Sequence, residues 1–299
     1  MKQSKAIGLV IIAAIYIIAI AIGVLVFRAL PELHIFLRIL IGDVVATTFV
    51  FLTGAILKNV SVYDPYWSVA PIAVFTGIML EYGRFDVGTV LLLLAVWYWG
   101  VRLTLNWAHT FVNLNTQDWR YDQFKQKFPR LFQLISFCGL NMFPTMVVFL
   151  VMLPGIEFLQ ESAFNPITIV GFVICLSATT IQLIADLQMH RFRRENVGKK
   201  RIIRSGLWKY SRHPNYLGEI LMWWGVYVVM LSSLPNRWIL FVGALVNTLM
   251  FYFVSIPLAD KRNSKIREGF GAYLKETNRM WLFKAPSTIK GRVNNGSRN

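Results

Sequence analysis

Acidic residues and cysteines are both scarce in this 299-residue chain. It has 15 Asp and Glu against 31 Lys and Arg, a net charge of +16, and two cysteines. Cys138 and Cys175 fall within apolar stretches and match no metal-binding spacing, so we expect neither a metal site nor a disulfide. A nucleic-acid partner is also not expected, because 56% of the residues are hydrophobic, which exceeds the usual share in soluble domains. Anionic lipid headgroups or a phosphorylated ligand are better partners for the charge.

The apolar residues come in blocks of about 20, long enough to cross a hydrocarbon layer about 30 Å thick. Backbone polar groups in lipid must be satisfied within the segment, so such blocks form helices. The sequence therefore predicts an all-α, multi-pass membrane helix bundle with about eight spans. They run roughly over residues 6–27, 35–57, 67–82, 88–112, 132–153, 165–189, 215–232 and 237–258.

Positive charge is distributed unequally between the two sides that these spans define. An even number of spans places both termini on one side, and that side then holds 26 of the 31 Lys and Arg. Positive charge stays preferentially in the cytoplasm, so both termini are predicted to be cytoplasmic. We expect an N-terminal span within residues 1–34, retained rather than cleaved, a membrane domain over 35–286, and a disordered basic tail over 287–299.

Several ionisable residues lie where a charge is costly. Asp43 and Arg102 fall inside spans, where a charge costs at least about 2.5–3.5 kcal/mol, so each is either paired or functional. Asp64 precedes Pro65, a common helix start in which the carboxylate caps the helix. It can equally be a proton donor at the mouth of a cavity if its pKa is raised there, and the two interpretations are compatible.

Two helical stripes carry polar side chains toward the cytoplasmic side. Asn106 and His109 are three residues apart and share one face, either as ligand contacts or as solvated residues at the interface. A second stripe climbs into an otherwise apolar helix, which indicates a wet groove or a frayed helix end with ordinary salt bridges. Its members are Gln182, Asp186, His190 and Arg193.

The stretch 204–219 combines Arg, Gly, Lys, His, Pro, Asn, Tyr and Glu between two apolar blocks. Pro214 can open a helix, and a helix N-terminus preceded by Arg212 and His213 is a natural phosphate site. Glu219 either accepts an N–H from a ligand or holds Arg212 in place. A basic loop lying on anionic lipid explains the charge equally well, but not the ordered mixture of residue types.

The residues Gly206–Glu219 resemble the signature of bacterial membrane proteins related to steroid 5α-reductase. They are similar, more distantly, to sterol reductases and isoprenylcysteine carboxyl methyltransferases. The segments Asp186–Arg194, Trp119–Tyr121 and Pro257–Tyr273 extend the resemblance over about residues 40–284. It implies a seven-span core, open to the cytosol, to which the first span is an addition.

The resemblance also implies an NADPH pocket on the cytoplasmic side. The matching positions are Asp186, Arg193, Tyr210, Asn215 and Glu219, with Lys261 and Arg262 in the closing basic segment. We expect His190, Arg212, His213 and Tyr216, which share the two polar motifs, to contribute to the same pocket. The catalytic carboxylate of the 5α-reductases falls near Asp64, beside Tyr63, while Asn106 and His109 stand near the positions of the family's Tyr and Arg.

The function expected from this resemblance is NADPH-dependent reduction of a lipid-soluble α,β-unsaturated ketone, or of a steroid-like or isoprenoid double bond. Asp64 or Tyr63 would polarise the carbonyl group. An S-adenosylmethionine-dependent membrane methyltransferase and a non-catalytic membrane protein that kept the fold are the alternatives. The expected location is the bacterial inner membrane or the endoplasmic reticulum, and the sequence predicts no oligomeric state.

Overall fold

The computed structural model describes residues 4–161 and 163–283, and in this part of the chain it contains helices and no β-strand. The predicted all-α membrane bundle is confirmed. The basic tail predicted over 287–299 lies outside the described residues.

Twelve α-helices make up most of the described residues. They are α1 Lys5–Ala29, α2 Ile35–Ile56, α3 Tyr66–Tyr82, α4 Val87–Thr110, α5 Trp119–Lys127, α6 Phe132–Ile135, α7 Phe143–Glu161, α8 Pro166–Glu195, α9 Pro214–Ser233, α10 Phe241–Met250, α11 Ile256–Ile266 and α12 Phe270–Glu276. Short 3-10 turns are η1 Val60–Val62, η3 Gly206–Lys209 and η4 Pro235–Leu240, and π-helical segments are η2 Ser136–Met142 and η5 Phe251–Ser255.

Seven helical runs in the described residues are long and apolar enough to cross a membrane. The π-helical segments join α6 to α7 and α10 to α11, so residues 132–161 and 235–266 each form one continuous run. The predicted third span corresponds to α3, which has 17 residues and is about 26 Å long. It falls slightly short of a spanning helix, yet it packs lengthwise against α4 and α7. The expected eight spans are therefore seven spanning helices and α3.

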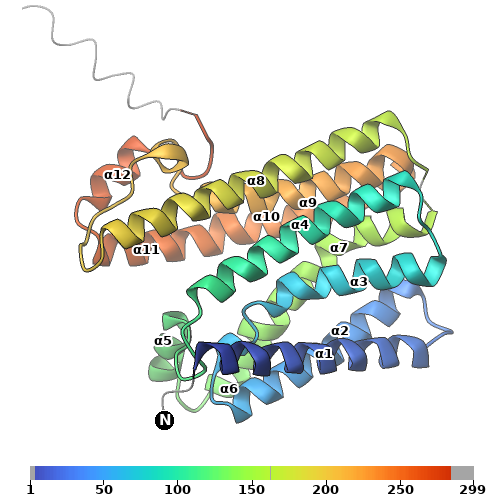
Figure 1. The fold of residues 1–299 in the computed structure, drawn as a ribbon, viewed down its shortest axis with the longest axis horizontal. Coiled ribbons are helices and arrows are strands. Elements are labelled where there is room, and N and C mark those ends of the chain that lie inside the picture. The colour runs from blue at the N-terminus through green and yellow to red at the C-terminus, as the bar shows by residue number, and fades with distance from the viewer. Residues whose placement is uncertain (1–3, 162, 284–299) are drawn as a thin grey trace, which may run out of the picture.

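Both described ends of the chain lie at the same end of the bundle. Figure 1 shows the start of α1 together with α5, α6, α11 and α12 at this end, which we call the terminal end. The Lys5 ammonium donates a hydrogen bond to the backbone oxygen of His109, at the close of α4 (2.9 Å). The start of α1 and the end of α4 therefore meet at the terminal end.

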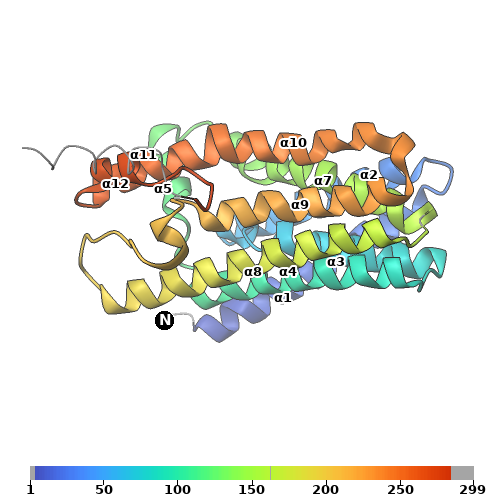
Figure 2. The same ribbon diagram turned by 90° about the horizontal axis from the view of Figure 1, so that it is seen from above.

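The most extensive helix contact in the described residues is between α8 and α9, and α9 lies between α8 and α10 (Figure 2). Glycine makes this approach possible: a Cβ on Gly218 would meet the backbone oxygen of Ala178 at 2.5 Å, and one on Gly225 would meet Cys175 Sγ at 2.5 Å. Both cysteines are free, and Cys175 is buried at this contact. This rigid pair positions the polar side chains described next.

Candidate functional site

A buried ion pair links α4 to α8. Arg102 Nη1 lies 2.8 Å from Asp186 Oδ2, and the two side chains are only 5% and 14% exposed. Arg102 Nη2 also donates a hydrogen bond to Gln182 Oε1. The Arg102 charge, which the sequence places inside the fourth span, is therefore paired with Asp186 and hydrogen-bonded to Gln182. Both partners belong to the predicted α8 stripe.

Glu219 is fully engaged within the bundle core. Its two carboxyl oxygens accept hydrogen bonds from the indole nitrogens of Trp99 (2.8 Å) and Trp223 (2.9 Å). The expectation that Glu219 holds Arg212 is wrong, because Asp260 of α11 takes that role at 3.2 Å. Indole donors from α4 and α9 instead supply this buried carboxyl group with partners.

Arg212 and His213 fasten the C-terminal segment to the start of α9. Arg212 donates hydrogen bonds to the backbone oxygens of Thr277 (2.5 Å) and Leu274 (3.1 Å). His213 Nε2 lies 2.9 Å from Asp260 Oδ1. We call Arg212, His213 and Asp260 the α11 clamp. Sequence reasoning missed Asp260, although a carboxylate in a strongly basic segment was a usable signal.

The remaining predicted cofactor residues lie around this clamp. Pro214 opens α9 as expected, and the Tyr216 ring stacks on His213 with centroids 5.1 Å apart. Tyr210 is half-buried at the end of η3, whereas Lys261 is exposed on α11. Some of these predicted residues are therefore engaged in contacts within the protein, whereas others are partly or fully exposed.

Two histidines and an asparagine meet where α4 and α8 reach the terminal end. His190 Nε2 lies 2.6 Å from Asn106 Oδ1, and the rings of His109 and His190 are edge to face at 4.7 Å. The α4 face and the α8 stripe, which were predicted separately, therefore form one polar group. It lies at the helix ends beyond the Arg102–Asp186 pair.

Asp64 does not cap α3, so this prediction is wrong. The helix begins at Tyr66, with Pro65 at the capping position and no side-chain cap. The Asp64 carboxylate instead accepts a hydrogen bond from the Tyr121 hydroxyl of α5 at 2.5 Å. Burial raises the pKa of Asp64 to about 6, and the bond from Tyr121 limits the rise.

Tyr63 and Asp64 occupy a different place from the histidine group. The Tyr63 hydroxyl lies 2.7 Å from Thr145 Oγ1 of α7. In the described part of the chain, neither Tyr63 nor Asp64 shares a hydrogen bond with Asn106 or His109. The four predicted catalytic residues therefore form two separate pairs.

Replacing Asp64 with asparagine should raise the thermal unfolding midpoint at pH 8 and change it little at pH 4. The ordinary pKa is 3.8 and the folded value about 6, so ionising the carboxyl opposes folding as pH rises from about 4 through 6. The amide removes that penalty and keeps an acceptor for Tyr121. Midpoints at both pH values test this. An equal shift at both would contradict it, and Asp122→Asn, an exposed change on α5, is the control.

Cations form a rim at the terminal end. Arg193 of α8 lies within electrostatic range of Asp186, Arg262 and Arg267. The Arg262 guanidinium stacks over the Trp119 ring at 4.1 Å from its centroid. Segments from α5, α8 and α11 therefore meet at one rim, where Arg193, Arg262 and Arg267 concentrate positive charge.

Besides Arg212 Nε of the α11 clamp, three buried polar atoms near this rim have no protein partner. They are Asn215 Oδ1, Arg102 Nε and Gln182 Nε2. Native proteins leave few such groups unsatisfied, and each needs an explanation. One acceptor and two donors, from α9, α4 and α8, fit a polar ligand with amide-like groups.

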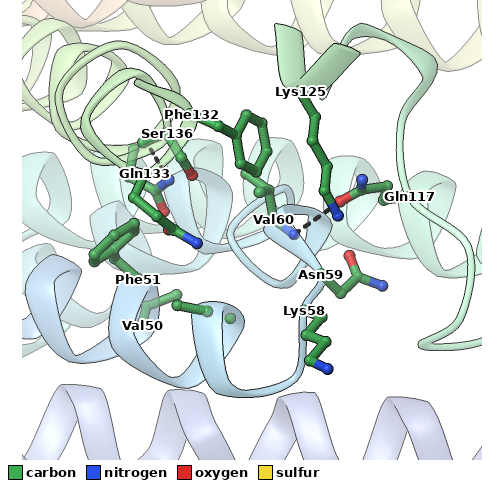
Figure 3. Close-up of a pocket in the computed structure, with 13 residues that line it drawn as sticks. Val50, Phe51, Lys58, Asn59, Val60, Gln117, Lys125, Phe132, Gln133 and Ser136 are labelled. Carbon is green, nitrogen blue, oxygen red and sulfur yellow. Dashed lines mark hydrogen bonds between the residues drawn. The ribbon is translucent and has the colours of Figure 1, made fainter. Parts of the chain in front are cut away.

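A separate small pocket of about 80 Å³ lies where α2, η1, α5 and η2 meet (Figure 3). Lys58 and Lys125 line it together with amide side chains, and Gln117 accepts a hydrogen bond from the Val60 backbone nitrogen at 3.2 Å. None of the predicted site residues lines this pocket. Asn59 and Gln117 hold the loop between α4 and α5 against the segment that follows α2, because Asn59 also donates hydrogen bonds to the backbone oxygens of Leu114 and Thr116.

Fold and site together define an all-α membrane protein with a buried polar cluster and a cationic rim at one end of its bundle. The family model described as "Protein of unknown function (DUF1295)" matches residues 50–277, and the chain belongs to this family. It is also 25% identical over 214 residues to Uncharacterized protein C594.04c of Schizosaccharomyces pombe, a match that covers 62% of each chain. No solved structure matches the chain.

Proposed function

We propose that this protein is an NADPH-dependent membrane reductase that acts on a lipid-soluble α,β-unsaturated ketone, or on a steroid-like or isoprenoid double bond. The observation that carries the proposal is the set of unsatisfied buried atoms on Asn215, Arg102 and Gln182, beneath a cationic rim. The resemblance of Gly206–Glu219 to the steroid 5α-reductase signature supports the same assignment.

The rim residues suit the phosphates of a dinucleotide. Arg193, Arg262 and Lys261 are exposed at the terminal end, where guanidinium and ammonium groups bind phosphate oxygens. Asn215 Oδ1 is free to accept an amide or amine hydrogen. When bound, NADPH supplies a hydride, and the protein supplies orientation and exclusion of water.

Asp64 is the proposed proton donor. With a pKa of about 6, a fraction of the carboxyl groups remains protonated near neutral pH, as general acid catalysis requires. The Tyr121 hydroxyl holds this carboxyl group at 2.5 Å. Tyr63 is next along the chain and offers a second hydroxyl for polarising a carbonyl oxygen.

The proposed orientation places the terminal end in the cytoplasm. Most Lys and Arg lie at this end, and positive charge of this kind is retained on the cytoplasmic side. NADPH would then reach the rim from the cytosol, and the lipid-soluble substrate would enter from the bilayer. The membrane is the bacterial inner membrane or that of the endoplasmic reticulum.

Purified protein should bind NADPH more tightly than NADH, because the rim adds charge-assisted contacts to the additional phosphate. Asn215→Ala should weaken NADPH binding about tenfold, the value of one lost hydrogen bond. Arg193→Ala should weaken NADPH more than NADH. Isothermal titration calorimetry measures all three.

The control for Arg193 is Arg191→Ala, two residues away on α8. Arg191 is exposed and pairs with Glu195 at 2.8 Å, so its loss should leave affinity within twofold, as exposed pairs contribute little. If the protein bound S-adenosylmethionine and neither dinucleotide, the reductase proposal would be wrong and a methyltransferase would take its place. Binding of none of the three would favour a non-catalytic protein that kept the fold.

A further inference from the structure

A second, larger hollow lies among α1, α2 and α3, on the side of α3 that faces α1. Its volume is about 340 Å³, within the range typical of small-molecule sites. Small residues from the three helices line much of it, including Ala19, Gly23, Ala46, Ala73 and Gly77. A Cβ added to Gly77 would meet no atom within 4 Å. Gly77 is exposed, so the three helices leave an open groove that their own side chains do not fill.

Most of the lining is apolar, but Arg28 and Glu81, both exposed, line it close to the ends of α1 and α3, and Asp43 is the buried carboxyl group in it. Asp43 is 7% exposed, and its Oδ1 accepts a hydrogen bond from the Tyr66 hydroxyl at 3.0 Å. Among the described residues, Tyr66 is its hydrogen-bond partner and no cation pairs with it. Asp43 is eight residues into α2, about 12 Å along the helix. A carboxyl group at this depth is costly, and no described residue donates a hydrogen bond to its second oxygen.

We propose that this hollow binds a lipid-soluble alcohol, of ring or branched isoprenoid type, whose hydroxyl group hydrogen-bonds to Asp43. A hydroxyl both donates and accepts, so it satisfies the carboxyl group in either protonation state. A phosphate headgroup would meet the Arg28 cation only near the end of α1. At the depth of Asp43 it would be repelled by the carboxylate and would lose its hydration. A bare acyl chain would fill the space but leave the carboxyl oxygen unsatisfied.

The site is distinct from the proposed cofactor site. None of Asn215, Arg193 or Arg102 lines it, and α1, which forms one wall, precedes the family match at residue 50. The inference therefore does not depend on the proposed reductase activity. NADPH affinity separates the two experimentally, because variants of this hollow should leave it unchanged.

The test is photolabelling of the full-length protein in nanodiscs. The probe is a cholesterol analogue with a ring diazirine, compared with its 3-O-methyl ether and its 3-amino counterpart. The alcohol should label α1–α3 saturably, and unlabelled cholesterol should compete. Asp43→Leu should weaken apparent affinity about tenfold, the value of one hydrogen bond to a carboxyl group. Gly77→Leu should abolish saturable labelling by filling the hollow.

Matched variants separate binding from misfolding. Gly139→Leu adds the same bulk at another open helical glycine and should label like the wild type. Tyr66→Phe removes a hydroxyl alone and should weaken labelling less than Asp43→Leu. Equal labelling of Asp43→Leu and wild type, equal competition by the ether, or stronger labelling by the amine would each overturn the proposal.

Discussion

Replacing Arg102 with methionine is expected to lower the free energy of unfolding by about 3–5 kcal/mol. The substitution keeps much of the side-chain volume but leaves the Asp186 carboxylate, which is 14% exposed, without its partner at 2.8 Å. It also removes the donor to Gln182 Oε1. Removing one member of a buried ion pair lowers the free energy of unfolding by more than the intact pair contributes, because the other charge remains buried without a partner.

The double variant Arg102→Met with Asp186→Leu is the informative comparison. It should regain most of the lost stability, since replacing a buried pair by apolar groups is often neutral. Reversible unfolding of purified protein, followed by circular dichroism, measures both. Arg191→Met, at an exposed pair on α8, should cost less than about 1 kcal/mol. A double variant as unstable as the single variant would show that the pair itself is not the source of the loss.

Replacing Asp260 with leucine should release α11 and α12 while leaving α8 and α9 intact. Asp260 holds Arg212 at 3.2 Å and His213 at 2.9 Å, and both are buried. Without it, two buried groups lose their carboxylate partner. Local opening should become easier by about 3 kcal/mol, which accelerates amide hydrogen exchange about 100-fold over residues 256–283.

Hydrogen exchange with mass spectrometry resolves this effect by segment. Exchange in α8 and α9 should change by less than about threefold, because their packing does not involve the clamp. Glu276→Gln is the control: its partner Arg204, at 2.5 Å, is about half exposed, so the pair contributes little. Uniform acceleration throughout the chain would show instead that the clamp supports the whole bundle.

The sequence predicted the fold well, because each spanning helix is specified locally by its own apolar block. Boundaries of α1, α2, α4 and α9 lie close to those expected, whereas α8 continues six residues beyond the predicted end of its span at residue 189. The sequence indicated that Arg102 is either paired or functional, but it did not identify Asp186 as the partner. These residues are 84 positions apart, and helix periodicity carries no information about which faces of two helices meet.

The sequence singled out polar residues around the candidate site, but it did not predict the contacts that they make. The motif at 204–219 correctly marked a helix that opens at Pro214. It did not reveal that Arg212 and His213 face Asp260, or that Glu219 faces two indoles. Side chains from neighbouring helices decide such contacts. Asp64 was misplaced for the same reason, since Tyr121 of α5 competes for its carboxylate.

The π-helical segment Phe251–Ser255 precedes α11 in one continuous helical run. It determines the direction in which the side chains of α11 point around the helix axis. A π-turn holds one residue more than an α-turn, and one residue corresponds to about 100° of helical rotation. Asp260 points at His213 with this extra residue in place. Removing a single residue here would turn α11 by about a quarter of a revolution and aim Asp260 elsewhere, without altering the apolar character of the span. Related chains should therefore tolerate substitution in this segment far better than a gap.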